Sequence, residues 1–348
     1  MGVWFDCALP ERFGNPATEY RYARETVALV DKNYRAFLYF TGPDRVRYLN
    51  AVLTNNIRDL AAGQGNASLL LNPQGRILAE VETYALEDRL LVVSYAMIRE
   101  LLVTTFDKFI IMDDVTLDDA TDKLTALALE GPATPALLSK LCGLDLDSLG
   151  ELGHAEAVVA AIPCRVVRRS PGGVPGAEFI CARGDVSKLW QALSEAVRAQ
   201  RGGPIGYATL NVLRLEAGIP WFGYDFDDKV IPHEAGLEET HISFTKGCYT
   251  GQEIVERVRS RGHVNRRRVG LLFSGTTVPA SGEKLFAAGQ EAGHVTRDGV
   301  SPALGCAIGM GYVRREHNSP GSRLEWAGGT AEVIELPIAA ARAGRSGP

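Results

Sequence analysis

The chain lacks any long apolar run. No stretch approaches the roughly 18–20 residues that a membrane-spanning helix requires. The N-terminus also lacks the apolar run of a secretion signal, since Trp4, Asp6 and Glu11 come early. A formal net charge of -5 argues against wholesale coating of nucleic acid, so direct nucleic-acid binding is not expected. These absences predict a cytoplasmic protein without a membrane segment.

Metal-binding and disulfide patterns are also missing. The six cysteines form no C-x-x-C pair, and none lies beside a histidine at zinc-ligand spacing. We therefore expect reduced thiols and no metal site. His233, His241 and His263 have no ligand spacing either, and we interpret them as structural or surface groups.

The composition and the apolar patterning predict a folded protein of several units. Apolar residues make up 46% and charged residues 23% of the 348 positions, close to the averages for globular proteins. At about 100–200 residues per domain, this length predicts two or three structural units. A first α+β round is expected between Tyr34 and Asp114, and a second one after a break near 115–125.

Within these rounds the periodicity predicts individual elements. In the first, we expect a helix from Thr41, strands at Ala67–Leu71, Arg76–Leu86 and Leu90–Ser94, and a helix over Ile98–Phe109. In the second, we expect strands at Lys123–Glu130, Glu156–Ala161, Cys164–Arg169 and Ala177–Ala182, and helices over Pro132–Cys142, after Asp185 and over Tyr207–Ala217.

The texture of the sequence changes after Arg266. Short apolar runs, such as Val269–Phe273, Gly293–Val295 and Ala307–Tyr312, alternate there with Gly, Pro, Ser and Asp turns. This pattern is typical of a small antiparallel barrel or sandwich. The last residues, 339–348, are rich in Ala, Gly and Arg, and we expect a disordered tail.

Glu216 lies near the end of an otherwise apolar helix, where the helix dipole disfavours a carboxylate without a partner. One interpretation is that the carboxylate accepts a bidentate pair of hydrogen bonds from the amino-pyrimidine edge of a pterin. The other is an internal salt bridge with Arg214 or with a loop arginine. The sequence leaves both interpretations open.

A single cysteine, Cys248, stands in the octet K-G-C-Y-T-G-Q-E. Thr250 and Glu253 have the S/T-x-x-E spacing of a capping box, which predicts a helix starting at Gly251. The helix dipole and Lys246 would both favour a thiolate at Cys248. Such a thiolate could attack an electrophile or lend one sulfur to a shared iron–sulfur cluster. Alternatively, Cys248 is an inert residue that fills a gap.

Arg257, Arg259 and Arg261 begin the strongest basic run of the chain, which extends to Arg268. The run is either a solvated surface or a patch for an anion, such as a polyglutamate tail, an RNA phosphate or an acidic partner. It has no interleaved aromatic residues, so the stacking of single-stranded nucleic acid is not supported.

These segments resemble the glycine-cleavage T-protein (aminomethyltransferase) superfamily, and within it the YgfZ-type folate-binding proteins and their mitochondrial iron–sulfur assembly counterparts. The resemblance covers nearly the whole chain. Its blocks are Thr41–Asn56, Leu70–Arg76, Arg214–Pro220 (R-L-E-A-G-I-P), Pro232–Leu237 (P-H-E-A-G-L) and Gly293–Val313. The octet with Cys248 resembles the mark of the YgfZ branch.

The resemblance implies an α+β fold, a T-protein-like ring of two α+β units over residues 20–265, with a C-terminal antiparallel β-barrel over residues 266–338. It implies tetrahydrofolate as the cofactor, bound in a central channel. It also implies Glu216, Lys246 and Tyr249 as folate-binding residues.

One departure from the T-proteins concerns an acidic pair that follows their hairpin glycine, in which one aspartate is essential for aminomethyl transfer. Counting from Gly75, this chain has Ala79-Glu80 at that place. With alanine for one acid, the sequence argues against the T-protein reaction.

We therefore expect a tetrahydrofolate-binding protein that supports assembly or repair of iron–sulfur clusters in client enzymes, and that influences tRNA modification through them. On this hypothesis the chain is not a glycine-cleavage aminomethyltransferase, and Cys248 is a candidate reactive thiol. Its partners would be iron–sulfur assembly proteins or client iron–sulfur enzymes. The alternative is a folate-dependent aminomethyltransferase or demethylase, and a third hypothesis is an interaction scaffold that has lost folate.

Overall fold

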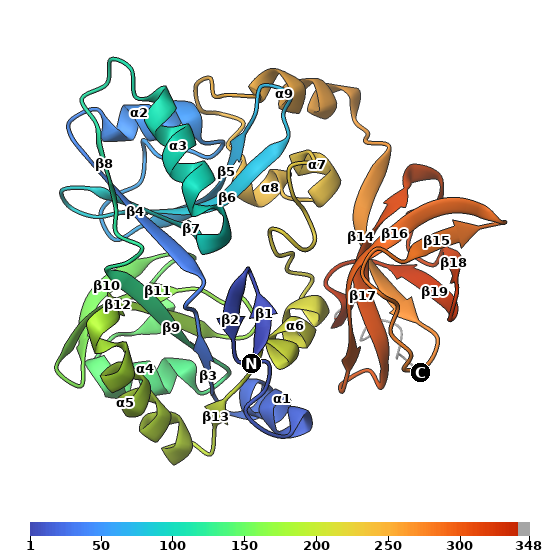
Figure 1. The fold of residues 1–348 in the computed structure, drawn as a ribbon, viewed down its shortest axis with the longest axis horizontal. Coiled ribbons are helices and arrows are strands. Elements are labelled where there is room, and N and C mark those ends of the chain that lie inside the picture. Colours follow the sequence, from blue (N-terminus) through green and yellow to red (C-terminus); the bar gives the residue numbers. More distant parts are fainter. Residues whose placement is uncertain (340–348) are drawn as a thin grey trace. The chain divides into compact units, whose positions relative to one another are not determined.

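A computed structural model describes residues 1–339 of the chain (Figure 1). The chain forms two compact units. The first unit comprises Met1–Leu71, Ala79–Thr209 and Thr240–Thr250, and the second comprises Asn72–Leu78, Leu210–Glu239 and the chain from Gly251 onward. Each unit is therefore built from segments that are far apart in the sequence.

The first unit contains a six-stranded sheet with the strand order β10-β11-β12-β9-β3-β13. Its strands are β10 (His154–Val159), β11 (Ile162–Arg168), β12 (Gly176–Ala182), β9 (Leu124–Glu130), β3 (Ala28–Asp31) and β13 (Gly203–Pro204). All neighbours pair antiparallel except β13, which runs parallel to β3. The strands expected in the second α+β round are confirmed to within two residues at each end.

One face of this sheet is covered by the helices α4 (Thr134–Cys142) and α5 (Val186–Ala199) (Figure 1). In α5, Leu189, Leu193 and Val197 recur every four residues, so they form one apolar stripe along the helix. That stripe is buried against Leu127 and Leu129 of β9. The period of the sequence thus fixes which side of the helix faces the sheet.

The opposite face of the sheet carries buried charges. Glu130 is paired across the strands with Gly176, and Glu178 with Ala128, so both side chains point away from Leu127 and Leu129 of β9. Glu178 lies 3.3 Å from the Nε atom of Arg35. The Glu130 Oε2 atom accepts a 3.3 Å hydrogen bond from the backbone of Gly172, whereas Oε1 has no hydrogen-bond partner among the described residues.

Burial raises the pKa of Glu130 to about 8 from 4.5, with Lys32 and then Arg169 opposing that shift. Between these two values the folded protein binds a proton that the unfolded chain has lost. Stability should therefore fall as the pH rises through this window, by up to about 1.4 kcal/mol per pH unit. We expect Glu130→Gln to remove this slope and to be more stable than the parent chain at pH 8. Chemical unfolding from pH 5 to 8 measures it, and Glu156→Gln, at an exposed carboxylate, is the control.

A five-stranded sheet completes the framework of the first unit, with the order β5-β6-β7-β4-β8. Its strands are β5 (Gly65–Leu71), β6 (Ile77–Ala85), β7 (Leu90–Tyr95), β4 (Arg35–Thr41) and β8 (Thr116–Asp119). The helices α2 (Arg45–Val52) and α3 (Arg99–Phe109) are its helical partners. The rings of Phe106 and Phe40 pack edge to face, with their centroids 5.2 Å apart. The backbone carbonyl of Phe106 accepts a 2.6 Å hydrogen bond from the Tyr48 hydroxyl.

The N-terminal residues form elements that the sequence did not reveal. These are β1 (Gly2–Trp4), β2 (Cys7–Leu9) and the helix α1 (Pro16–Glu25). The first two form a hairpin whose tip places Phe5 against the rings of Tyr34 and Tyr95, at 4.3 and 5.2 Å between centroids. Three-residue strands are too short for an apolar period, which explains why sequence patterning missed them.

The second unit contains the C-terminal barrel. The barrel is formed by the strands β14 (Arg266–Phe273), β15 (Lys284–Ala287), β16 (Gln290–Ser301), β17 (Cys306–Arg314), β18 (Arg323–Trp326) and β19 (Gly329–Ile334). It is closed, because β14 pairs with both β17 and β19. The mixed α+β class with a C-terminal antiparallel barrel is thereby confirmed. The strand β16 is longer than expected, since a register shift between Val295 and Arg297 lets it continue past its charged residues.

The remaining helices are α6 (Tyr207–Glu216), α7 (Pro232–Ala235), α8 (Glu238–His241) and α9 (Gln252–Arg261). Within residues 1–339, no helix is long and apolar enough to cross a membrane. The expected domain boundaries at 20–265 and 266–338 stay a prediction. From residue 340, the expected disordered tail lies outside the described part of the chain.

Candidate functional site

Glu216 is buried at the end of α6, with 1% of its surface exposed. Its Oε1 atom accepts a 2.5 Å hydrogen bond from the hydroxyl of Ser301, which itself accepts a 3.0 Å bond from the backbone of Leu304. Arg214 forms an ion pair with Asp225. The barrel therefore supplies a hydroxyl partner for this carboxylate. As a folate ligand, Glu216 stays a prediction.

Lys246 anchors its own segment to the first unit. Its ammonium nitrogen lies 2.5 Å from the carbonyl oxygens of Asn50 and Leu53 and 3.0 Å from that of Asn55. A lysine ammonium has three donors, so these bonds occupy all of them and satisfy carbonyls at the C-terminal end of α2. Burial, followed by the charge of Arg58, lowers the pKa of Lys246 to about 8. No pattern in the sequence predicts this structural role.

The other octet residues occupy different surroundings. Tyr249 is buried, and its ring centroid lies 5.1 Å from the Lys246 ammonium, whereas Cys248 is exposed. The expected capping box is wrong, because Gly251 is the N-cap of α9 with φ +82°, and this N-cap has no side-chain hydrogen bond among the described residues. Only glycine adopts such a left-handed backbone without strain.

The basic run contains its own counter-charges. On α9, Arg257 donates a 2.5 Å hydrogen bond to Glu253, and Arg259 lies 3.6 Å from Glu256. Both arginine side chains are about half exposed, so each pair is a weak surface ion pair. The side chain of Arg261 lies outside what the structure describes. As a patch for an anion, the run stays a prediction.

A second array of titratable groups is centred on Glu80 of β6 in the first unit. Its Oε2 atom accepts a 2.9 Å hydrogen bond from the Tyr95 hydroxyl, and its Oε1 atom lies 3.2 Å from Nε2 of His241. The Glu80 and His241 side chains are 15% and 10% exposed. Burial and then the Glu80 charge raise the pKa of Tyr95 well above its usual value. The phenol therefore keeps its proton and acts as a donor.

His241 is fixed from both its backbone and its ring. The Thr54 hydroxyl donates to the His241 carbonyl at 2.6 Å, and the backbone of Ser243 donates to the Thr54 carbonyl at 3.1 Å. A carboxylate only accepts hydrogen bonds, so Nε2 of His241 is the donor toward Glu80, and the Thr240 hydroxyl lies 2.7 Å from Nδ1. The sequence analysis placed His241 among structural or surface groups, because its partner is 161 residues away.

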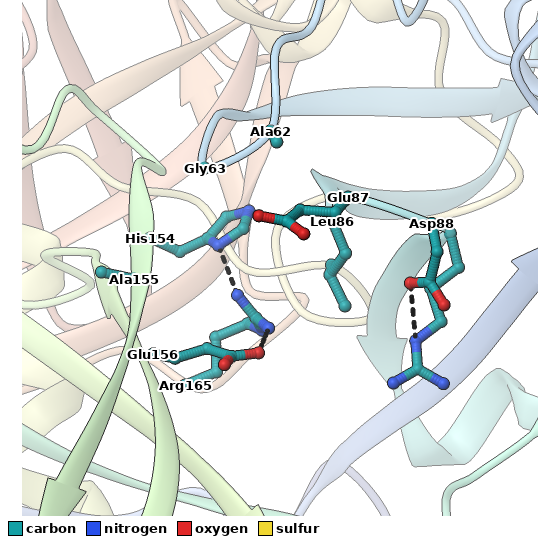
Figure 2. A pocket seen from close by; sticks show the side chains of 10 residues that line it. Ala62, Gly63, Leu86, Glu87, Asp88, His154, Ala155, Glu156 and Arg165 are labelled. Atoms are coloured by element: carbon teal, nitrogen blue, oxygen red, sulfur yellow. Dashed lines mark hydrogen bonds and ion pairs between the residues drawn. The ribbon is translucent and has the colours of Figure 1, made fainter.

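A cavity of about 660 Å³ in the first unit lies apart from these arrays (Figure 2). Two ion pairs line it: Arg165 bonds Glu156 at 2.6 Å and lies 2.9 Å from Nδ1 of His154, and Asp88 lies 3.7 Å from Arg89. Burial, assisted by Arg165, lowers the pKa of His154 to about 4, so the imidazole is neutral. No candidate residue named above is among the described residues that line this cavity. Nor do three His, Cys, Asp or Glu side chains of the described chain gather as metal ligands would.

Comparison with known proteins resolves the family. The family model for the GCVT N-terminal domain matches residues 1–246, and the model for the glycine cleavage T-protein C-terminal barrel domain matches residues 266–338. The chain belongs to the glycine cleavage T-protein family. Both parts of a T-protein are therefore present, in the order in which the structure shows them.

Relatives of this T-protein chain extend over nearly its whole length. It is 32% identical to an aminomethyltransferase of Streptomyces coelicolor over 95% of this chain and 91% of that protein. It is 30% identical to an aminomethyltransferase of Streptomyces avermitilis, over 90% and 85% of the two chains. The fold matches that of the glycine cleavage system aminomethyltransferase T from Bartonella henselae, with a TM-score of 0.88 at 24% identity over 97% and 93% of the chains.

These comparisons correct the functional expectation. The assignment to the YgfZ branch is wrong, and with it the role in iron–sulfur assembly, the effect on tRNA modification and the expectation that the chain is not an aminomethyltransferase. The structure gives a physical reason why the octet resembled that branch. Lys246 satisfies backbone carbonyls, Tyr249 fills buried space and Gly251 provides a left-handed turn. Such packing roles explain these octet residues without any cluster chemistry.

Proposed function

We propose that this T-protein is a tetrahydrofolate-dependent aminomethyltransferase of the glycine-cleavage type. The observation that carries the proposal is the similarity, over 90% or more of the chain, to proteins named aminomethyltransferase. The donor would be an aminomethylated lipoyl carrier protein, and tetrahydrofolate would be the acceptor substrate. We place the reaction in the cytoplasm.

The chemistry of the transfer requires an acid–base group. As the carbon leaves the carrier sulfur and bonds to a folate nitrogen, that nitrogen loses a proton and the sulfur takes one up. A carboxylate with a fixed orientation can accept and return such a proton, a contribution of about 10²–10⁴-fold to rate. Glu80, held by Tyr95 and His241, is the group of the first unit that suits this task.

The alanine at position 79 does not argue against this function. Ala79 is fully buried in β6, whereas the neighbouring Glu80 keeps a partly exposed carboxylate. Successive residues of a strand point to opposite faces, so only one of the two positions can present an acid on a given side. This chain retains that acid at Glu80.

For folate itself we propose Glu216 as a pterin ligand and Tyr249 as a further contact. Glu216 has the chemistry for it, because a buried carboxylate can accept from an amino-pyrimidine edge. Lys246, whose three donors bind backbone carbonyls, would hold the octet segment in place. The basic residues Arg257, Arg259 and Arg261 would suit the polyglutamate tail.

The proposal is tested by assaying transfer from an aminomethylated lipoyl carrier to tetrahydrofolate, with calorimetry of tetrahydrofolate binding in parallel. We expect turnover by the parent chain, and weaker folate binding by Glu216→Gln, by about tenfold, because one acceptor becomes a donor at the pterin edge. Glu332→Gln, on the barrel strand β19, is the matched control. Folate binding without turnover would contradict the transferase. Equal affinity of both variants would remove Glu216 from the site.

A further inference from the structure

The carboxylate of Glu80 has donors on both oxygens, and these donors come from different parts of the first unit. Tyr95 ends β7, the neighbour of β6 in the sheet, whereas His241 ends α8 and enters the unit with the segment Thr240–Thr250. Their donor atoms lie 2.9 and 3.2 Å from Oε2 and Oε1. A carboxylate held at both oxygens has little freedom to rotate, so the remaining lone pairs of its oxygens keep a fixed orientation.

Each donor is itself prevented from moving. The Tyr95 ring packs against both Phe5 and Tyr34, with centroid distances of 5.2 and 5.7 Å, and burial keeps its hydroxyl protonated. The His241 backbone is held by the Thr54 hydroxyl. This rigidity is greater than a surface ion pair between two exposed side chains would have.

The ring of His241 adds a property that a simple donor lacks. Its two nitrogens are engaged at once, with Thr240 at Nδ1 and Glu80 at Nε2. Other groups facing Glu80 are Tyr95 and the hydroxyl of Ser94, which donates to the Glu80 carbonyl at 2.7 Å.

We propose that His241 is a positioning residue for Glu80 in aminomethyl transfer, acting together with Tyr95 to hold the carboxylate in the orientation from which it exchanges a proton with the substrate. This inference rests on the proposed function, because it assigns a role within that reaction. It adds His241 and Tyr95 to the candidate residues, neither of which the sequence pointed to.

The test compares His241→Leu and His241→Gln with the parent chain in the transfer assay. Leucine removes the donor, so we expect kcat to fall by about 10-fold to 100-fold, the cost of a misplaced catalytic group, while KM for tetrahydrofolate stays the same. Glutamine restores an N–H near the position of Nε2 and should recover most of the lost rate. His263→Gln, at an exposed histidine, is the matched control.

A spectroscopic readout separates this inference from the proposed function. In ¹⁵N spectra of the full chain, Glu80→Gln should shift the Nε2 resonance of His241, because that nitrogen loses its carboxylate acceptor. An unshifted resonance, or an unchanged kcat in His241→Leu, would overturn the inference. If Glu80→Gln shifts the resonance but the parent chain shows no transfer, the proposed function is overturned instead. Equal losses in kcat for the leucine and glutamine variants would also contradict a role based on the N–H donor.

Discussion

Glu80→Gln is expected to lower kcat for aminomethyl transfer by about 10²–10⁴-fold, the usual contribution of a positioned acid–base group. Glutamine has nearly the same size as glutamate and can still accept from Tyr95 through its carbonyl oxygen, 2.9 Å away in the parent chain. It cannot accept a proton from the substrate. The structural cost should therefore be small while the chemical step is lost. Steady-state rates with saturating tetrahydrofolate measure this effect.

Two further measurements give the Glu80 result its meaning. Tetrahydrofolate affinity should stay within a factor of about three of the parent value, because the variant removes chemistry and keeps the binding surface. Glu100→Gln, on the exposed side of α3, is the matched control and should retain full activity. If Glu80→Gln turns over at the parent rate, another group must carry the proton.

Asp225→Ala is expected to destabilise the second unit by about 3–5 kcal/mol, the usual cost of removing one partner of a buried ion pair. Asp225 pairs with Arg214, and both side chains are 0% exposed. The same carboxylate accepts hydrogen bonds from the backbone of Trp221 at 2.9 Å and from the Thr296 hydroxyl at 2.7 Å. Without it, the buried guanidinium loses the charged partner that Asp225 provides.

Chemical unfolding measures this effect, with fluorescence of Trp221 as a local signal, because the Arg214 guanidinium lies 4.6 Å from that ring. Asp227→Ala is the matched control, since the Asp227 side chain is 42% exposed and its partner Lys229 lies 3.6 Å away at the surface. We expect the control to change stability by less than about 0.5 kcal/mol. A loss of that small size for Asp225→Ala would mean that the pair is solvated in solution.

The sequence predicted those elements whose side chains repeat regularly. The strands β9 and β12 and the helix α5 were found because alternation, or a recurrence every four residues, is set by burial of one face. The hairpin of β1 and β2 is too short for any period. The end of β16 continues through a register shift, which no alternation reveals.

The candidate site was only partly predictable, for a different physical reason. Glu216 could be singled out because a carboxylate near a helix end is locally unusual. His241 could not, because what makes it notable is Glu80, which lies 161 residues away in the sequence. The octet was overinterpreted, because a motif that serves a tight turn and a buried lysine resembles one that serves catalysis.

The bond from Thr54 to the carbonyl of His241 has a consequence for biosynthesis. It joins residues 187 positions apart, and the segment that carries His241 follows part of the second unit in the chain. A ribosome adds about 5–20 residues per second, so this segment is synthesised on the order of ten seconds or more after Thr54. During that interval Glu80 lacks its His241 donor. The acid–base array is therefore completed late, after most of the first unit has left the ribosome.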